Sequence, residues 1–363
     1  MSTNDDIYKK LSKVLYTLPN GFPSTESGVE IKILKRIFSP EEAELFCDLR
    51  LSFETPEQIA ERTGRPMEGL SDKLKSMWEK GQLFGVDFGE VQTYRMLPWV
   101  FGIYEFQLKR LDRELAELCE EYAPIFGKQF FGETPQLMQV VPIENEIKNT
   151  QEALPFEKVS SIIENGKSFA VNECICKKEK ALLDQRCDKP LEVCMAIAPV
   201  PGFFESDIAW GGRVITKEEA YTILQDAEKA GLVHMTSNFQ SGQFYICNCC
   251  GCCCGVLRSI NELGLKNSIH SNYYAVIDPE LCESCGLCAA DRCQIEAIRE
   301  SDTAYEVIKD KCIGCGLCIT TCPAEAIRLE RKPVDECIIP PINEDEWFKQ
   351  RAETRGVDYS NFA

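Results

Sequence analysis

Apolar side chains between residues 30 and 98 recur with the 3.6-residue period of α-helices. Two predicted helices have clear start signals, Ser-Pro-Glu-Glu at residues 39–42 and Thr-Pro-Glu at residues 55–57. In both, a hydroxyl side chain can cap the helix and Pro occupies its first turn. Apolar spacing predicts a third helix over residues 66–80, and residues 83–97 are predicted to form two short β-strands.

This order of a helix, a helix-turn-helix and a hairpin resembles a winged helix-turn-helix domain. The resemblance implies DNA binding through the third helix, residues 66–80. Residues 30–97, however, contain 10 basic and 13 acidic side chains, so the basic surface that DNA binding needs is missing. We therefore expect residues 1–98 to form a docking or dimerisation module with an N-terminal arm, and we do not expect DNA as a partner.

Residues 99–155 connect this region to the rest of the chain. Helical spacing predicts a long amphipathic helix within residues 99–131, which we expect to pack in a core or in a homodimer interface. Its predicted apolar face consists of Ile103, Phe106, Leu108, Leu111, Leu115, Leu118 and Tyr122. Residues 132–155 contain Pro135, Pro142 and Pro155 and are predicted to be a linker.

The composition allows two to three domains in 363 residues, with a formal net charge of −18. That charge argues against general binding to nucleic acid or to anionic membranes. No apolar stretch approaches the roughly 18 residues of a membrane-spanning helix. The N-terminus is acidic and polar, unlike a secretion signal, which predicts a cytoplasmic protein.

Cysteine is the unusual residue, because 18 of the 21 cysteines fall between Cys174 and Cys322. In a reducing cytosol, dense cysteines at short spacings indicate metal or iron–sulfur ligation rather than disulfides. With only His234 and His270 in the chain, a His-rich zinc or copper centre is excluded. We expect both histidines to be packed or surface residues, and Cys47 and Cys119 to be small buried hydrophobes.

An internal repeat marks the C-terminal region. Residues 276–299 read VIDPELCESCGLCAADRCQIEAIR, and residues 307–328 read VIKDKCIGCGLCITTCPAEAIR. The second copy has the C-x2-C-x2-C-x3-C-P spacing of bacterial ferredoxins. The first copy has one extra residue before its fourth cysteine and lacks the Pro. Gly286 and Gly316 permit tight loops with backbone N–H groups turned toward sulfide.

Residues 271–335 thus resemble a bacterial-type dicluster ferredoxin domain. The resemblance implies two [4Fe–4S] clusters in which the fourth cysteine of each copy binds the cluster of the other copy. It implies one ligand set of Cys282, Cys285, Cys288 and Cys322, and a second of Cys312, Cys315, Cys318 and Cys293. A structural zinc site fits two triplets and two single cysteines poorly.

Ten further cysteines lie in the middle region, residues 156–270. They are Cys174, Cys176, Cys187 and Cys194, and then Cys247, Cys249, Cys250, Cys252, Cys253 and Cys254. Packed thiols oxidise, and packed thiolates repel, unless a metal compensates them. We therefore expect the two groups to meet and to share at least one iron–sulfur centre, with one or two such centres in all.

The arrangement within the middle region stays open at this stage. In an extended chain Cys247, Cys249 and Cys253 would face one way and the other three of their group the opposite way. The first four cysteines could close a site alone. One centre with a redox-active cysteine pair is the alternative. The CCG triplet is similar to cysteine motifs of heterodisulfide reductases, but its spacing departs from theirs, so no substrate is carried over.

The sequence predicts an α+β multidomain protein. We expect a winged-helix-like domain (1–98), a helix and linker (99–155), a Cys-rich domain (156–270), a ferredoxin-like domain (271–335) and a tail (336–363). The whole chain resembles uncharacterised iron–sulfur proteins of anaerobes. It contains no nucleotide or flavin motif. We expect an electron-transfer component that exchanges single electrons with a partner oxidoreductase. A redox-sensing transcription regulator and a reductase of disulfides or small substrates are the alternatives.

Overall fold

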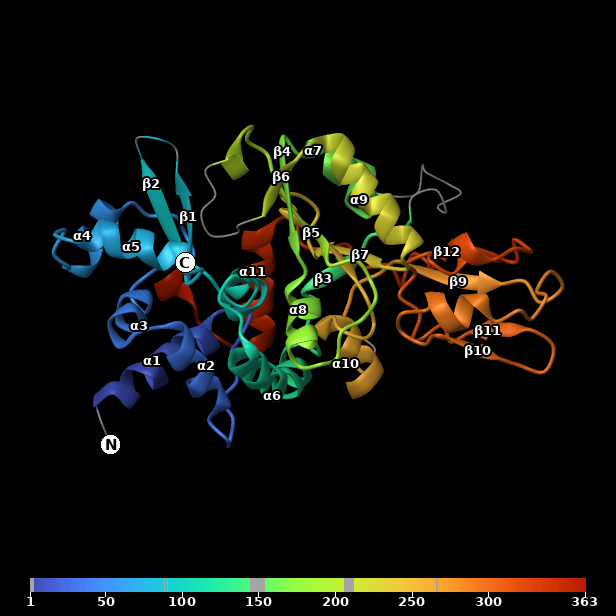
Figure 1. The fold of residues 1–363 in the computed structure, drawn as a ribbon, viewed down its shortest axis with the longest axis horizontal. Helices are drawn as coiled ribbons and strands as arrows, with labels where there is room; N and C mark the ends of the chain where they lie inside the picture. The colour runs from blue at the N-terminus through green and yellow to red at the C-terminus, as the bar shows by residue number, and fades with distance from the viewer. Residues whose placement is uncertain (1–2, 88, 90, 144–153, 206–211, 266) are drawn as a thin grey trace.

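The structure, a computed structural model, describes residues 3–87, 89, 91–143, 154–205, 212–265 and 267–363. Three regions follow one another along the long axis of the molecule in Figure 1: a mainly helical N-terminal region, a central β-sheet with helices on its two faces, and a small β-rich region at the far end. Residues 144–153 of the predicted linker lie outside the described residues.

The N-terminal region contains the predicted helices followed by an antiparallel hairpin, and it begins with a further helix, α1, within the residues predicted to form an arm. Its elements are α1 (Thr3–Thr17), α2 (Val29–Ile37), α3 (Pro40–Phe46), α4 (Pro56–Thr63), α5 (Leu70–Glu79), β1 (Leu83–Asp87) and β2 (Gln92–Met96). Both predicted helix starts are confirmed, because Ser39 and Thr55 each form a capping box. Helix α5 starts at Leu70, after the left-handed Gly69, rather than at residue 66. The winged-helix assignment itself stays a prediction.

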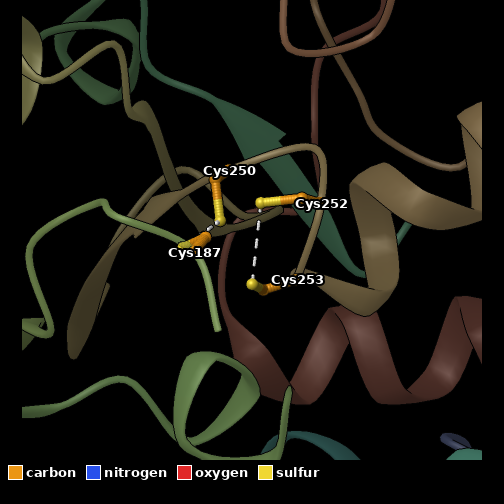
Figure 2. A group of neighbouring side chains, drawn as sticks. All are labelled: Cys187, Cys250, Cys252 and Cys253. Carbon is orange, nitrogen blue, oxygen red and sulfur yellow. Dashed lines mark hydrogen bonds between the residues drawn. The ribbon is translucent and has the colours of Figure 1, made fainter. Parts of the chain in front are cut away.

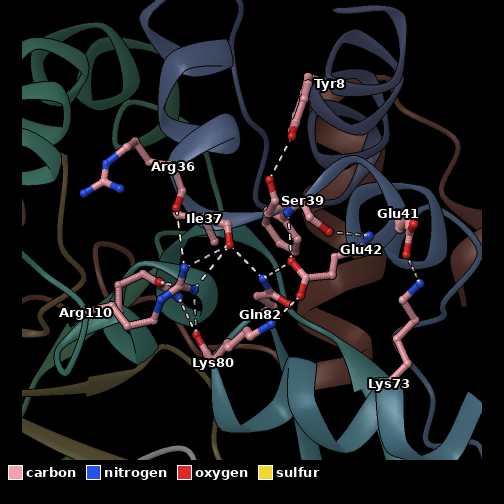
Figure 3. Close-up of polar contacts among 12 residues, drawn as sticks. Tyr8, Arg36, Ile37, Ser39, Glu41, Glu42, Lys73, Lys80, Gln82 and Arg110 are labelled. Atoms are coloured by element: carbon pink, nitrogen blue, oxygen red, sulfur yellow. Dashed lines mark hydrogen bonds and ion pairs between the residues drawn. The ribbon is translucent and has the colours of Figure 1, made fainter. Parts of the chain in front are cut away.

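Basic side chains of α5 are engaged by acids of α3 (Figure 3). Lys73 Nζ lies 2.7 Å from Glu41 Oε2, and Lys80 Nζ, at the end of α5, lies 2.6 Å from Glu42 Oε1. Glu42 also accepts a hydrogen bond of 2.9 Å from Gln82. These two lysines therefore connect α3 and α5 within this region.

The predicted long helix is shorter than the apolar pattern suggested. Helix α6 (Arg113–Phe130) begins only after Asp112, whose side chain accepts a hydrogen bond from the backbone N–H of Leu115. The preceding residues form two short turns, η1 (Trp99–Ile103) and η2 (Glu105–Gln107). The prediction was wrong for residues 99–112, because packed turns can bury apolar side chains without a helical backbone.

The central region is a six-stranded antiparallel sheet with the order β3-β7-β8-β5-β4-β6. Its strands are β3 (Met138–Val140), β4 (Ser168–Glu173), β5 (Glu192–Ala198), β6 (Arg213–Ile215), β7 (Val233–Ser237) and β8 (Tyr245–Cys249). Strand β3 lies within the stretch predicted as a linker.

Helices cover both faces of this sheet. On one face, α7 (Val159–Asn165) and α9 (Lys217–Lys229) pack on the side chains of Phe169, Met195 and Ile246. Helix α9 starts after Thr216, which forms a capping box with Glu219. On the other side lie α6, α8 (Ile175–Leu182) and α10 (Gly255–Leu263). Short helical turns η4 (Pro155–Glu157) and η5 (Phe203–Glu205) complete the region.

The β-rich region contains two antiparallel strand pairs. Strand β9 (Tyr273–Ile277) pairs with β12 (Ile327–Arg331), and β10 (Ile298–Glu300) pairs with β11 (Tyr305–Val307). The turns η6 (Cys288–Arg292) and η7 (Ile319–Thr321) follow the two cysteine triplets. This region therefore carries the internal repeat of the sequence as two related halves.

The final residues return to the N-terminal region instead of trailing away from it (Figure 1). Helix α11 (Glu344–Arg355) buries Arg351 completely, and this side chain donates hydrogen bonds to the backbone oxygens of Phe130 and Pro135. Arg95 of β2 pairs with Glu344 at 2.8 Å. The short turn η8 (Ser360–Phe362) ends the chain, with Phe362 accepting from the backbone N–H of Leu51.

Candidate metal centres

The two cysteine loops of the β-rich region have the same backbone geometry. Gly286 and Gly316 occupy equivalent positions with φ values of 76° and 84°. Ser284 matches Gly314, and Glu296 matches Glu325, and all four residues also have positive φ. Left-handed backbone turns successive N–H groups toward a common centre, as anion-binding loops require. The predicted role of the glycines agrees with these angles.

These loops bring the eight cysteines together as two quartets. The first quartet, Cys282, Cys285, Cys288 and Cys322, lines one gap of about 20 Å³. The second quartet, Cys293, Cys312, Cys315 and Cys318, lines another of about 20 Å³. Each gap thus joins three cysteines of one repeat to the fourth cysteine of the other, which is the pairing that the ferredoxin resemblance implied.

Backbone N–H groups point at several of these sulfur atoms. Ala297 N lies 3.0 Å from Cys293 Sγ, and Ala326 N lies 3.3 Å from Cys322 Sγ, four residues after the cysteine in both cases. Ala275 donates to Cys312 Sγ at 3.4 Å. Such donors stabilise thiolates, so the donor set fits a thiolate-bound iron–sulfur cluster.

The extra residue of the first repeat is absorbed next to its fourth cysteine. Residues 288–292 form a wide five-residue turn, η6, where the second repeat has the three-residue turn η7. The wider turn leaves Cys293 within the second quartet. The insertion therefore changes the local backbone and not the grouping of the cysteines.

The two quartets differ in their surroundings. Cys285 of the first quartet is exposed, and its neighbours Leu281 and Leu287 are 53% and 45% exposed. The second quartet faces the central region: Val233 of β7 lines its gap, and the backbone oxygen of Cys315 accepts from Ile143 at 3.1 Å. Burial raises the pKa of Cys315 to about 12. One quartet is therefore accessible from outside, and the other lies against the sheet.

Seven cysteines of the central region line a larger cavity of about 130 Å³. One of them, Cys253, also belongs to a tighter group of cysteines described below, so we name this cavity the six-thiol cavity after the other six. They are Cys174, Cys176, Cys194, Cys247, Cys249 and Cys254. Cys194, Cys247 and Cys249 alternate with residues that face α7 and α9, so their side chains project from the opposite face of the sheet. Helices α8 and α10 begin beside Cys174 and Cys254 and supply the remaining thiols.

The six thiols influence one another strongly. Interactions with Cys176 and Cys194 lower the pKa of Cys174 well below its usual value. The pKa values of the other five are raised well above theirs, largely by neighbouring cysteines and by burial. Deprotonating several of these thiols at once therefore requires a compensating cation, as a bound metal would supply.

Aromatic side chains also line the six-thiol cavity, together with acids that include Glu105 and Glu179. Tyr104 donates a hydrogen bond to Glu179, and Glu105 accepts one of 2.7 Å from the backbone of Gly102. Burial raises the pKa of Glu105 to about 8 and that of Glu179 to about 7. Both acids can hold a proton near neutral pH. Neither residue belongs to a recognisable motif, so the sequence did not indicate them, although Glu179 follows Cys176 by only three residues on α8.

The remaining four cysteines of the middle region form a separate, tighter group, which we call the four-thiol group (Figure 2). The Sγ atoms of Cys187, Cys250, Cys252 and Cys253 all lie within 4.8 Å of one another. The distance from Cys187 Sγ to Cys250 Sγ is 3.9 Å, and that from Cys252 Sγ to Cys253 Sγ is 3.6 Å. Cys187 therefore lies with the later cysteines and not with Cys174, Cys176 and Cys194.

This grouping corrects the prediction from alternation. The Sγ atom of Cys253 groups with those of Cys250 and Cys252, although Cys253 also borders the six-thiol cavity. Cys254 lies with Cys247 and Cys249, on the side opposite to the one predicted for it. The reason is that residues 251–253 form a turn before α10, so the chain is not extended there. The expectation that the two sequence groups meet in space agrees with the structure, because each thiol group draws cysteines from both.

The single cysteines and the histidines lie outside these groups or at their edge. Cys47 and Cys119 are buried, as predicted, although Cys119 also borders the six-thiol cavity. Cys337 donates to the backbone oxygen of Lys332. Both histidines are buried: His234 contacts Asn248 and Glu228, and burial lowers the pKa of His270 to about 4.

Comparison with known proteins identifies part of the chain. Residues 305–328 match the family described as 4Fe-4S binding domain. An uncharacterized ferredoxin of Methanocaldococcus jannaschii is 32% identical over 101 residues, 28% of this chain and 58% of that protein. An uncharacterized protein of Methanothermobacter thermautotrophicus is 34% identical over 88 residues, 23% of this chain and 19% of that protein. No solved structure gives a significant match.

These matches confirm the resemblance to a [4Fe–4S] ferredoxin domain over the second repeat. The chain spans just over half of the first relative and about a fifth of the second, so the family of the whole chain stays open. Among the described residues, no helix is both long and apolar enough to cross a membrane.

Proposed function

We propose that this protein transfers single electrons through two [4Fe–4S] clusters in residues 271–335. The first would be held by Cys282, Cys285, Cys288 and Cys322, and the second by Cys293, Cys312, Cys315 and Cys318. The observation that carries the proposal is the meeting of each cysteine triplet with the fourth cysteine of the other repeat. Bound clusters would supply one-electron redox chemistry.

The surroundings of the quartets support a route from the surface toward the sheet. The first quartet has an exposed cysteine and an apolar rim, so a redox partner protein could approach it closely. The second quartet touches residues 143 and 233 of the central region. The acidic chain would favour a partner with a basic docking patch, because complementary charge speeds such encounters.

The six-thiol cavity is the proposed inner end of this route, with a third iron–sulfur centre. Its cysteines are buried or half-buried, and several thiolates together need a compensating cation. The volume of the cavity also exceeds that of each quartet gap. Six thiols can occupy every iron of a four-iron centre, so no open coordination position is required. That favours electron transfer over the reductase alternative. Glu105 and Glu179 would hold protons beside the centre when its charge changes.

Anaerobic purification of the full chain, with iron and acid-labile sulfide counts and EPR of the reduced protein, tests this proposal. We expect at least two distinct [4Fe–4S] signals and about four iron atoms for each occupied site. Zinc in place of iron at both quartets would reject the electron-transfer function. The cytoplasmic location and the anaerobic source stay predictions.

A further inference from the structure

The four-thiol group has the dimensions of a site for one metal ion. Four ligands at the corners of a tetrahedron around zinc, each about 2.3 Å from it, lie about 3.8 Å from one another. Cys187 and Cys250 are 3.9 Å apart, Cys252 and Cys253 are 3.6 Å apart, and all four sulfurs fall within 4.8 Å. The sulfurs are therefore already spaced as a single tetrahedral ion would space them.

The same spacing is too small for a cubane. A cube inserts several iron and sulfide atoms between its four thiolates, so their sulfurs must lie farther apart than around one ion. The protein supplies its own comparison: within the described residues, no other group of three or more Cys, His, Asp or Glu ligand atoms is as tight. The matched 4Fe-4S domain supplies three cysteines of the second quartet. The sulfur atoms of that quartet therefore lie farther apart than those of the four-thiol group.

The surroundings indicate a structural role for the ion. Cys187 lies in the loop 183–191 between α8 and β5, where residues 184–186 are exposed to solvent. Lys177 of α8 donates a hydrogen bond of 2.6 Å to the backbone oxygen of Pro190 in this loop. The positive charge of its ammonium group also helps to lower the pKa of Cys250. A metal bound by Cys187 and the turn 250–253 would fasten this exposed loop to the sheet, where apolar anchors are scarce.

The turn 250–253 also contacts the ferredoxin-like region. The backbone N–H of Gly251 donates to Gln294 Oε1 at 2.9 Å, and Asn261 donates to the backbone oxygen of Gln294 at 3.0 Å. Gln294 follows Cys293 of the second quartet. An ion that fixes residues 250–253 would therefore also fix the surface against which the second quartet rests.

We propose that Cys187, Cys250, Cys252 and Cys253 bind one structural zinc ion, separate from the iron–sulfur centres. All four positions of the tetrahedron are filled by thiolates, which is the closed arrangement of structural zinc sites and leaves no position for a substrate. This inference does not depend on the proposed electron-transfer function, because it concerns a different metal and different ligands.

Metal analysis of the full-length protein tests the inference. We expect about one zinc per chain that survives chelator treatment, and zinc X-ray absorption that fits four sulfur neighbours at about 2.3 Å without an iron neighbour. Absence of zinc, or a single iron ion at these four cysteines, would overturn it. Zinc with nitrogen or oxygen neighbours would show adventitious binding and would also overturn it.

Substitutions separate this site from the others. In Cys187→Ala we expect the zinc content to fall at least fivefold while the iron content is unchanged. In Cys337→Ala, a control cysteine outside both thiol groups, we expect zinc and iron to stay at the wild-type values. A loss of about four iron atoms in Cys187→Ala would instead assign Cys187 to a cluster and reject the zinc site. Should Cys187→Ala not fold, the absorption spectrum of the wild-type protein decides alone.

Discussion

Glu105 shows how one buried side chain can link pH to stability. Its carboxyl group lines an aromatic cavity, and burial raises its pKa to about 8. In the unfolded chain the pKa of Glu is about 4.3. Between these values the folded protein holds a proton that the unfolded chain releases, so this proton stabilises the fold at low pH and its contribution is lost as the pH rises toward 8.

Replacement of Glu105 by Gln should remove this dependence. Gln resembles the protonated acid and cannot ionise. Between pH 6 and pH 8 the free energy of unfolding should therefore decrease by about 2 kcal/mol less in the variant than in the wild type. Urea unfolding under anaerobic conditions at both pH values measures the difference. Glu117→Gln, an exposed glutamate of α6, serves as control and should follow the wild type. Equal pH dependence in all three proteins would contradict the buried proton.

The proposed exchange of fourth cysteines makes a prediction for a pair of variants. Cys293→Ala should damage the cluster of Cys312, Cys315 and Cys318, because Cys293 shares their gap and lies away from its sequence neighbours. Cys322→Ala should damage the cluster of Cys282, Cys285 and Cys288 in the same way. EPR of the two reduced variants should lose different signals. Loss of the same EPR signal in both variants would show that the fourth cysteines do not bind the clusters of the opposite repeats.

At the scale of elements, the sequence predicts structure best where a local signal exists. The capped starts of α3, α4 and α9 are found where Ser39, Thr55 and Thr216 place them. The central sheet was not predicted, because its pairing joins short strands that are distant along the chain and partly composed of cysteine. Helix α11 was missed because its apolar side chains are few, and its buried face includes Arg351, which donates to backbone oxygens.

Gly251, in the turn before α10, packs so closely against Gln294 of the ferredoxin-like region that no side chain fits between them. A Cβ atom there would lie 2.0 Å from the backbone oxygen of Gln294, so Gly251→Ala must push the ferredoxin-like region away from the turn. We expect a destabilisation of about 1–3 kcal/mol, as for other overpacked contacts. Gly255→Ala is the matched control, since a Cβ at Gly255 meets no atom within 4 Å.

Thermal unfolding, followed by the visible absorbance of bound clusters, compares the two glycine variants. Gly251→Ala should lose this absorbance at a lower temperature than the wild type, and Gly255→Ala should not. Identical thermal unfolding curves for both variants would show that the close contact between Gly251 and Gln294 does not contribute to stability.

At the scale of the whole molecule, the ten cysteines of the central region should raise the metal content above that of the ferredoxin-like region. Two C-terminal clusters would contain about eight iron atoms. A centre in the six-thiol cavity predicts a total of about twelve iron atoms in the full chain. Iron analysis of protein reconstituted anaerobically measures this number. A total that stays at eight would leave the six thiols without iron and favour the alternative of a redox-active cysteine pair.

The two ends of the ferredoxin-like region meet at one residue. Asn272, just before β9, accepts a hydrogen bond from Ile338 N at 3.0 Å and donates one of 3.1 Å to Ile338 O. Its own backbone oxygen accepts from Lys332 at 2.8 Å. A region that leaves and rejoins its host through adjacent strands has the geometry of an inserted module. Evolution, or an engineer, could therefore exchange this region for another electron carrier by splicing at Asn272 and Ile338, while leaving the chemistry of the host intact.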